Sequence, residues 1–360
     1  MNDRILMTGA SGFIGSRLAR ALAARGARLT LLCRPGSRGR LESRLGSWPE
    51  GIERPEIVLG DLSWPGVLSD PQDVGRLSGS VTGIFHLGAV YHLGVDAKTA
   101  ASINVRGTER LLELAHHLGR LRRFHHVSTI AVSGDASGTF YEQDLDRGQG
   151  FPHAYAHSKF LAELALRQSG LPCSIYRPGI VVGDSRSGEF DKIDGPYYLL
   201  RILSQLRRLP GARRMPMIAP REQAPLFHLV PVDYVVEAMA HLAMRDEGEA
   251  CATYHLTDPE PESFRSFYIA CLREMGFRGP IVSRPTRRFF RLLMLPGLRE
   301  LVRLGGRAFG MPAEMLAHVL IDVCYDTART REALAGTGLV CPRVLTYLPQ
   351  LVRTFEAETA

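Results

Sequence analysis

The chain has 360 residues, of which 45% are hydrophobic, and its formal net charge is +7. This length suits one large globular domain with a smaller companion, and no apolar stretch reaches the ~20 residues that a membrane span needs. Only three of the 44 basic residues are lysines (Lys98, Lys159 and Lys192), and no aromatic-basic motif accompanies the arginines, so we expect no nucleic-acid partner.

The chain opens on a short buried strand, residues 4–8, that leads through three glycines into a helical stretch. Gly9 permits a tight turn, Gly12 lets the backbone approach a pyrophosphate, and Gly15 lets the helix pack closely on the strand. The free N–H groups of the helix N-terminus favour phosphate. This order predicts a dinucleotide site, and the GxxGxxG spacing is typical of short-chain dehydrogenases/reductases. A glycine-rich turn without a ligand is the alternative, which the flanking strand and helix disfavour.

The next predicted strand, residues 28–33, indicates which nucleotide binds. An NAD enzyme usually carries an acidic residue at this strand end to hold the ribose 2′-OH. Here the position is Cys33, and Arg34, Arg38 and Arg40 follow it. No carboxylate would repel a 2′-phosphate, and Arg34 could bind one bidentately, so we predict NADP(H). The alternative is that these arginines are simply solvated.

Three later strand ends supply further predicted cofactor contacts: residues 61–62, residues 87–89 and residues 178–180. Repeated strand–helix units predict an α/β fold with a doubly wound parallel Rossmann sheet, whose ligands bind at the carboxyl ends of the strands. The predicted cofactor-binding residues are Gly9, Ser11, Gly12, Phe13, Ile14, Gly15, Arg34, Asp61, Leu62, Leu87, Gly88, Ala89, Asn104, Tyr155, Lys159, Pro178, Gly179 and Ile180.

Tyr155 and Lys159 stand four residues apart in PHAYAHSKF, so one helical turn places both side chains on the same face. A nearby ammonium lowers the pKa of a phenol, and we expect Lys159 also to hydrogen-bond the nicotinamide ribose. Thr129, or less favourably Ser128, ends a preceding buried strand and could hydrogen-bond a substrate oxygen as charge builds on it. Asn104, on a predicted helix, is expected to anchor a water or backbone group in the same relay. The predicted catalytic residues are therefore Thr129, Tyr155, Lys159 and Asn104.

After residue 180 the alternating pattern ends, and a polar loop at residues 183–196 precedes a basic helical stretch at residues 197–208. We predict an NADP-binding Rossmann domain at residues 1–182, with residues 225–250 packed back on it, and a smaller, mostly helical substrate-binding domain formed by residues 183–224 and 251–360. The stretch Arg287–Leu295 could lie on a membrane surface, line the mouth of an acyl tunnel, or be a helix packed in the smaller domain.

The cysteines and histidines give no sign of a metal site. Six cysteines are scattered without CxxC spacing, a pattern typical of a reducing compartment. His125 and His126 are adjacent on a predicted strand, but without metal-ligand spacing we interpret them as satisfied histidines at a sheet edge. The chain enters a strand at once, so we expect no signal peptide. We therefore expect a cytoplasmic protein with no metal ion.

The whole chain resembles the thioester-reductase and fatty acyl-CoA reductase group of extended short-chain dehydrogenases/reductases, in particular the first reductase domain of bacterial fatty acyl-CoA reductases. The similarity is carried by MTGASGFIGSRLARAL, GDL, IFHLGAVYHLG, NVRGTERLLELA, FHHVSTIAVSG, HAYAHSKFLAE, IYRPGIVVGDSRSGEFDKIDGPYY, LVPVDYVVEAMAHLA and RTREALAGTGLVCPRV. Two departures stand out. Gly88 occupies a position where the family often has alanine, and the second reductase domain of those enzymes is absent, which leaves open which reduction step this chain performs.

The resemblance implies an NADP-dependent oxidoreductase that transfers hydride to the carbonyl of a long-chain acyl thioester or a fatty aldehyde. Coenzyme A or an acyl carrier protein would carry the acyl group, and the many arginines suit such an anionic carrier. Alternatives are a sugar-nucleotide epimerase, a 3β-hydroxysteroid-type dehydrogenase and a non-catalytic NADP-binding regulator. The missing acidic residue at Cys33 argues against the epimerase, and the intact Thr129, Tyr155 and Lys159 argue against the regulator. The sequence leaves open the acyl chain length, the carrier and the oligomeric state.

Overall fold

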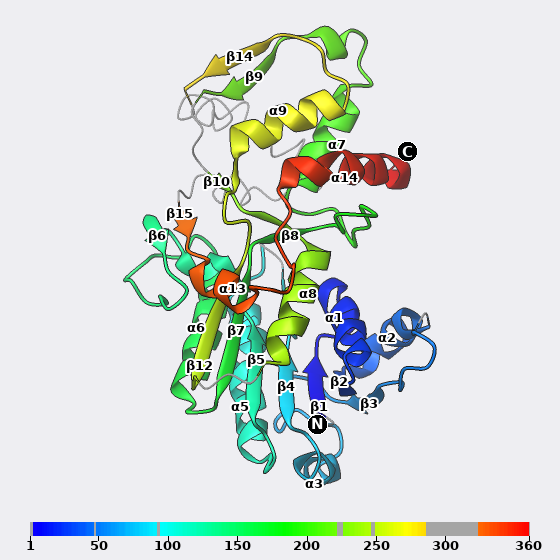
Figure 1. The fold of residues 1–360 in the computed structure, drawn as a ribbon, viewed down its shortest axis with the longest axis vertical. Coiled ribbons are helices and arrows are strands. Elements are labelled where there is room, and N and C mark those ends of the chain that lie inside the picture. Colours follow the sequence, from blue (N-terminus) through cyan, green and yellow to red (C-terminus); the bar gives the residue numbers. More distant parts are fainter. Residues whose placement is uncertain are drawn as a thin grey trace.

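The computed structural model describes residues 3–46, 48–91, 94–221, 226–245, 249–285 and 323–359. Its centre is a seven-stranded sheet with the strand order β12-β7-β5-β4-β1-β2-β3, in which every pairing is parallel (Figure 1). The strands are β1 (Arg4–Thr8), β2 (Arg28–Cys33), β3 (Glu56–Leu59), β4 (Gly83–His86), β5 (Arg123–Val127), β7 (Cys173–Pro178) and β12 (Cys251–Leu256). The predicted parallel, doubly wound sheet is confirmed.

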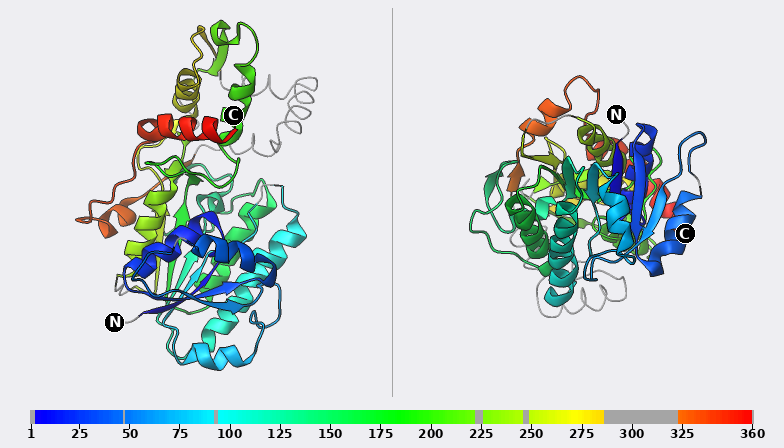
Figure 2. Two further views of the ribbon diagram at one scale, coloured as in Figure 1. Left: turned by 90° about the vertical axis from the view of Figure 1, so that its right-hand side faces the viewer. Right: turned by 90° about the horizontal axis from the view of Figure 1, so that it is seen from below.

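Helices cover both faces of the sheet because successive strand residues point in opposite directions (Figure 2). On one face, Ile5 and Met7 share an apolar cluster with α1 (Phe13–Ala24) and α8 (Val232–Ala243). On the other face, Leu6 belongs to a cluster with α5 (Arg106–His116) and the end of α6 (Ala154–Gln168). Shorter helices, α2 (Arg38–Leu45), α3 (Gln72–Ser78) and α4 (Ala97–Ala100), lie in the connections.

The strand order reverses between β1 and β4, which are neighbours in the sheet with Thr8 beside His86. From β1 the chain adds β2 and β3 on one side, and from β4 it adds β5, β7 and β12 on the other. Ligands of open α/β sheets bind at such a switch point, outside the carboxyl ends of the strands.

A second group of elements lies beyond the carboxyl ends of the strands, at the top of Figure 1. It contains α7 (Tyr197–Leu206), α9 (Phe264–Glu274) and α14 (Val344–Thr359), together with the parallel pair β9 (Met217–Pro220) and β14 (Ile281–Arg284). Its apolar cluster includes Leu203, Phe267 and Phe355. Short strand pairs connect the two groups: β8 (Ile180–Val182) with β11 (Leu229–Pro231), β10 (Leu226–Phe227) with β13 (Glu262–Ser263), and β6 (Gly138–Phe140) with β15 (Val323–Tyr325).

Several details differ from the sequence-based expectation. Residues 251–256, assigned to the smaller domain, form the edge strand β12 of the main sheet. Cys251 pairs in register with Cys173 on β7, and the two cysteines form a disulfide that sequence spacing alone did not indicate. His125 and His126 lie not at a sheet edge but on β5, which runs between β4 and β7.

Two further expectations concern membranes. No helix among the described residues is both long and apolar enough to span a bilayer. The stretch Arg287–Leu295, considered for membrane contact or an acyl tunnel, lies outside the described residues.

Candidate active site

The glycine turn between β1 and α1 is closely packed against the end of β4. Gly9 has φ +76°, and a Cβ at this position would lie 2.7 Å from the backbone carbon of Leu87. A Cβ on Gly15 would overlap the carbonyl oxygen of Gly9, so α1 begins directly against the turn. Within the described part of the chain, no side chain caps the first turn of α1, whose N–H groups are therefore free to meet a phosphate. The turn leaves room for ligand atoms only because these positions lack side chains.

Thr8 holds the two strand ends of the switch point together. Its hydroxyl accepts a hydrogen bond of 2.9 Å from the backbone N–H of Gly88 and shares one of 2.8 Å with Nδ1 of His86. The other ring nitrogen of His86 lies 3.0 Å from the hydroxyl of Thr108 on α5. Burial lowers the pKa of His86 to about 3, so the imidazole is neutral and works as a structural link.

A cavity of about 540 Å³ lies at this switch point and brings together most of the predicted site residues. The predicted residues that line it are Gly9, Gly12, Phe13, Ile14, Gly15, Leu87, Ala89, Thr129, Tyr155, Lys159, Pro178, Gly179 and Ile180. The predicted residues outside its lining are Ser11, Arg34, Asp61, Leu62, Gly88 and Asn104. The cavity is thus continuous from the glycine turn to the Tyr155 side chain.

Tyr155 and Thr129 share a hydrogen bond inside this cavity. Thr129 lies just beyond the last residue of β5, and its hydroxyl also accepts a hydrogen bond of 3.2 Å from the N–H of Ala131. Burial raises the pKa of Tyr155, and the bond from Thr129 only partly opposes this. The expected lowering of this pKa by Lys159 is not found: burial sets the shift, and the opposing effect comes from Thr129. The Tyr155 phenol is therefore held protonated, as a proton donor must be.

Lys159 lies one helical turn after Tyr155 and is buried at the end of β5. Its ammonium donates a hydrogen bond of 2.8 Å to the carbonyl oxygen of Val127 and lies 3.3 Å from Nε2 of His126. Burial lowers the pKa of Lys159 to about 8, and the negative charge of Glu163 acts in the opposite direction. The ammonium is therefore charged below about pH 8 and loses its proton above that pH.

Asn104 does not line the cavity, and its side chain instead bonds two neighbouring segments. It lies in the π-helical segment Ala101–Val105 between α4 and α5. Its side-chain oxygen accepts a hydrogen bond of 2.8 Å from the N–H of Val90, and its amide nitrogen donates to the hydroxyl of Ser158 at 2.9 Å. Asn104 therefore ties the loop after β4 to α6, and its part in a catalytic relay stays a prediction.

The arginines that follow β2 divide into two kinds. Arg40 lines the cavity together with Gly9 and Gly12, whereas Arg34 does not line it and lies 3.4 Å from the hydroxyl of Ser37. Arg40 was not among the cofactor contacts predicted from the sequence; its place at the start of α2, shortly after β2, was the available signal. Asp61 accepts hydrogen bonds from the backbone and hydroxyl of Ser63, at 2.8 Å each.

The loop of residues 183–196 forms one wall of the cavity through Phe190, Asp191, Lys192 and Asp194. Two ion pairs join it to helices α1 and α2: Glu189 with Arg17 of α1 at 2.8 Å, and Asp191 with Arg44 of α2. From α14, Gln350 and Thr354 donate hydrogen bonds to the carbonyl oxygen of Ser187. This loop thus connects the two groups of elements across the cavity.

Other lining residues carried no local sequence signal. The ring of Tyr91 stands edge-on to Tyr155 with centroids 5.1 Å apart, and the Lys192 ammonium lies 4.3 Å from the Tyr91 centroid. Tyr325 on β15 lines the same cavity, and its hydroxyl lies 2.7 Å from that of Ser133. Tertiary contacts alone bring these aromatic side chains to the cavity. Among the described residues, no group of three or more histidine, cysteine or acidic side chains is placed to hold a metal ion.

The chain matches one family model and several curated relatives. The model of a family described as male sterility protein, an NAD-binding family, matches residues 7–239. The chain is 27% identical over 375 residues to the isonitrile lipopeptide synthase of Streptomyces coeruleorubidus, covering 95% of this chain and 24% of that protein. It is 28% identical to the aldehyde reductase lnbA of Aspergillus flavus, covering 72% of this chain and 27% of that protein. The chain therefore spans only about a quarter of these relatives.

Among solved structures, the terminal R domain from the myxalamid PKS-NRPS biosynthetic pathway is similar in both sequence and fold. Its TM-score is 0.77 at 27% identity, and the match covers 99% of this chain and 91% of that one. The similarity thus extends over nearly the whole of both chains, including the second group of elements beyond the sheet.

Proposed function

The chain belongs to the male sterility protein family of NAD-binding, extended short-chain dehydrogenases/reductases, and on this basis we propose that it is an NADPH-dependent reductase of acyl thioesters. The acyl group would be bound to a carrier protein or to coenzyme A, and the product would be an aldehyde or, after a second reduction, an alcohol. This proposal rests on one observation above all: Thr129, Tyr155 and Lys159 line the same cavity as the glycine turn.

The dinucleotide would be held by the glycine turn and the first turn of α1, where the backbone approaches without side chains, and when bound it supplies the hydride. Tyr155 would donate its phenolic proton to the substrate oxygen, which burial of the phenol keeps available. Thr129 would donate a hydrogen bond to the same oxygen as negative charge develops on it. Lys159 would hold the ribose and place a positive charge near the reacting groups.

The choice of NADPH over NADH is supported by the residues that follow β2. Cys33 ends the strand where an acidic residue would repel a 2′-phosphate, and Arg40 lines the cavity. A planar guanidinium binds phosphate bidentately, and a lysine could not replace that geometry.

A carrier-bound thioester is favoured by the similarity to the terminal R domain of the myxalamid pathway. Direct reduction of aldehydes is a second proposed activity of the same site, since one relative is named an aldehyde reductase. The cavity wall includes Phe190, Leu226 and Phe227, which suit an apolar acyl chain. We therefore retain a long-chain acyl group as the proposed substrate. We also keep the cytoplasm as the proposed compartment, although the disulfide between Cys173 and Cys251 is atypical of a reducing compartment.

The deciding experiment measures NADPH oxidation with palmitoyl-CoA, with a palmitoylated carrier protein and with a long-chain aldehyde, and identifies the products by mass spectrometry. Aldehyde formed from either thioester supports the proposal. A chain that reduces only the free aldehyde would be an aldehyde reductase. Absence of NADPH oxidation with all three, accompanied by epimerisation of a UDP-sugar, would favour the sugar-nucleotide alternative, and NADPH binding without turnover would favour a regulator.

A further inference from the structure

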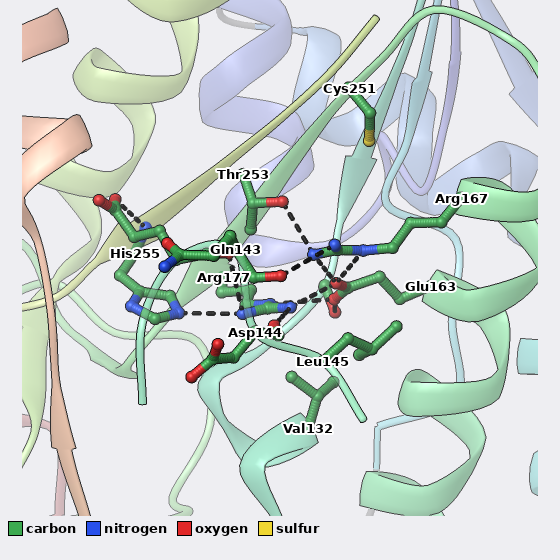
Figure 3. Close-up of polar contacts among 12 residues, drawn as sticks. Val132, Gln143, Asp144, Leu145, Glu163, Arg167, Arg177, Cys251, Thr253 and His255 are labelled. Carbon is green, nitrogen blue, oxygen red and sulfur yellow. Dashed lines mark hydrogen bonds and ion pairs between the residues drawn. The ribbon is translucent and has the colours of Figure 1, made fainter. Parts of the chain in front are cut away.

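Glu163 is a completely buried carboxylate on α6, one turn beyond Lys159. Its partners include Arg167 on the same helix and Arg177 on β7 (Figure 3). One of its oxygens accepts a hydrogen bond of 2.8 Å from the hydroxyl of Ser128, the residue directly before Thr129. The other accepts hydrogen bonds from Arg177 of β7 at 2.5 Å and from Arg167 of α6 at 3.0 Å. The carboxylate therefore joins the helix of Tyr155 to the ends of two neighbouring strands.

Arg177 extends this network to the loop between β6 and α6. Its guanidinium is also completely buried and donates to the carbonyl oxygen of Asp144 at 2.6 Å, and it lies 3.1 Å from Nε2 of His255 (Figure 3). The next residues along the chain, Pro178 and Gly179, line the cavity. A buried charge with this many partners resists displacement, because losing any partner leaves a charge unpaired in a low dielectric.

Three cations surround this carboxylate. Lys159 and Arg167 face it from its own helix, and Arg177 faces it from β7. The neighbouring histidines, His126 on β5 and His255 on β12, are neutral because burial lowers the pKa of each. Burial alone would raise the pKa of Glu163, but the adjacent arginines hold it at about 2. Glu163 is therefore ionised at every pH at which the enzyme would work.

We propose that Glu163 is a positioning residue of the reaction: it fixes the helix of Tyr155 and Lys159 against the strand end of Thr129 and supplies the negative charge that faces the Lys159 ammonium. The effect of Glu163 on catalysis rests on the proposed function. Its effect on the pKa of Lys159 does not, and that pKa can be measured without any substrate.

The test compares E163Q with the double variant E163Q/R177M. The single variant leaves Arg177 buried without its counter-ion and is expected to lose stability. The double variant removes both charges, so it should fold and bind NADPH normally while kcat falls by about tenfold or more through the loss of helix position. R167Q is the matched control, since it removes a partner of Glu163 at a partly exposed position but leaves the carboxylate and Arg177 in place.

The chain offers a direct second readout because it contains only three lysines. Labelling the lysine side chains with ¹³C and ¹⁵N gives three signals, and the signal missing in K159M identifies Lys159. Loss of the Glu163 charge should lower the pKa of Lys159, by about one pH unit for a close charge. The alkaline limb of the pH–rate profile should shift to lower pH in E163Q/R177M and stay in place in R167Q.

The outcomes are separable. A Lys159 pKa that is unchanged in the folded double variant would overturn the inference, and so would a normal kcat with a normal pH profile. If the wild type reduces no acyl substrate, the proposed function fails, but a shifted Lys159 signal would still establish the coupling.

Discussion

The ammonium of Lys159 donates a hydrogen bond to the backbone carbonyl oxygen of Val127, at 2.8 Å, and so sits at the end of β5 beside Thr129. This hydrogen bond holds the Lys159 ammonium at the end of β5, the strand that also leads to the hydroxyl of Thr129. Lys159 is held close to the reacting groups, and burial lowers its pKa. The activity of the enzyme should therefore change with pH as Lys159 gains or loses its proton.

We expect kcat/KM to fall as the pH rises above about 8. Burial lowers the pKa of Lys159 to about 8, so the ammonium is charged below that pH and loses its proton above it. A pH–rate profile of K159R provides the check, since a guanidinium stays charged to a much higher pH. K159R should be slower overall but should lack this alkaline limb. A wild-type profile that is flat from pH 7 to pH 10 would contradict the role given to Lys159.

Replacing Tyr155 by phenylalanine should reduce kcat by about 10²–10⁴-fold, the usual contribution of a positioned acid, and leave NADPH affinity nearly unchanged. The change removes only the hydroxyl that bonds Thr129. Single-turnover kinetics and a fluorescence titration with NADPH measure the two quantities. Y141F, at an exposed tyrosine, is the control and should behave as wild type. Near-normal turnover of Y155F at saturating substrate would show that another group donates the proton.

The variant G9A should bind NADPH much more weakly than the wild type. A side chain here meets the backbone of Leu87 at 2.7 Å and adopts a positive φ, which costs about 1–2 kcal/mol by itself. G26A is a matched control, because Gly26 also has a positive φ, +89°, but apart from its two chain neighbours no described residue has an atom within 4 Å of where its Cβ would be. Both variants should lose some thermal stability, and only G9A should lose cofactor affinity. If G9A and G26A bound NADPH equally well, the glycine turn would not be part of the nucleotide site.

The preference for NADPH over NADH should be about tenfold or more, because a bidentate charged contact is worth roughly 1.5–3 kcal/mol. Arg40 lines the cavity and Arg34 does not, so R40A should lose most of the preference and R34A a smaller share. R38A is the control, since Arg38 pairs with Glu42 at 2.8 Å on the exposed side of α2. Kinetics with both nucleotides measure the ratio. An unmodified enzyme that uses both equally well would contradict the prediction.

Catalytic efficiency should rise with acyl chain length. Each buried methylene contributes about 0.8 kcal/mol, which corresponds to roughly fourfold per carbon until the cavity is full. Measuring kcat/KM for C6 to C18 aldehydes and acyl-CoAs tests this, with the same series on a carrier protein as the third arm. A flat profile in all three series would eliminate the long-chain substrate and favour a short or polar acyl group.

Local sequence signals were enough for the fold and for the contacts of the glycine turn. Strand, turn and helix follow one another directly there, so Gly9 and Gly15 could be assigned from spacing alone. Tyr155 and Lys159 were equally accessible, because helical periodicity puts both on one face. The parallel sheet followed from the repeated strand–helix units.

The remainder of the site depends on contacts between distant segments, which spacing does not encode. Tyr91 and Tyr325 reach the cavity from separate connections, and no pattern around either residue indicates it. The upward pKa shift of Tyr155 also escaped prediction, because it comes from burial of the phenol, which spacing along the chain does not encode. The disulfide between Cys173 and Cys251 required the register of β7 and β12.

The loop of residues 183–196 has a consequence for the order in which the protein can assemble. Its ion pairs with α1 and α2 involve segments that precede it in the chain. Its hydrogen bonds with Gln350 and Thr354 involve α14, which is synthesised after every strand of the main sheet. A ribosome-bound chain can therefore complete the sheet and the glycine turn well before this wall of the cavity is secured. Cofactor bound during synthesis would meet an open site, and its release should slow only once α14 has left the exit tunnel.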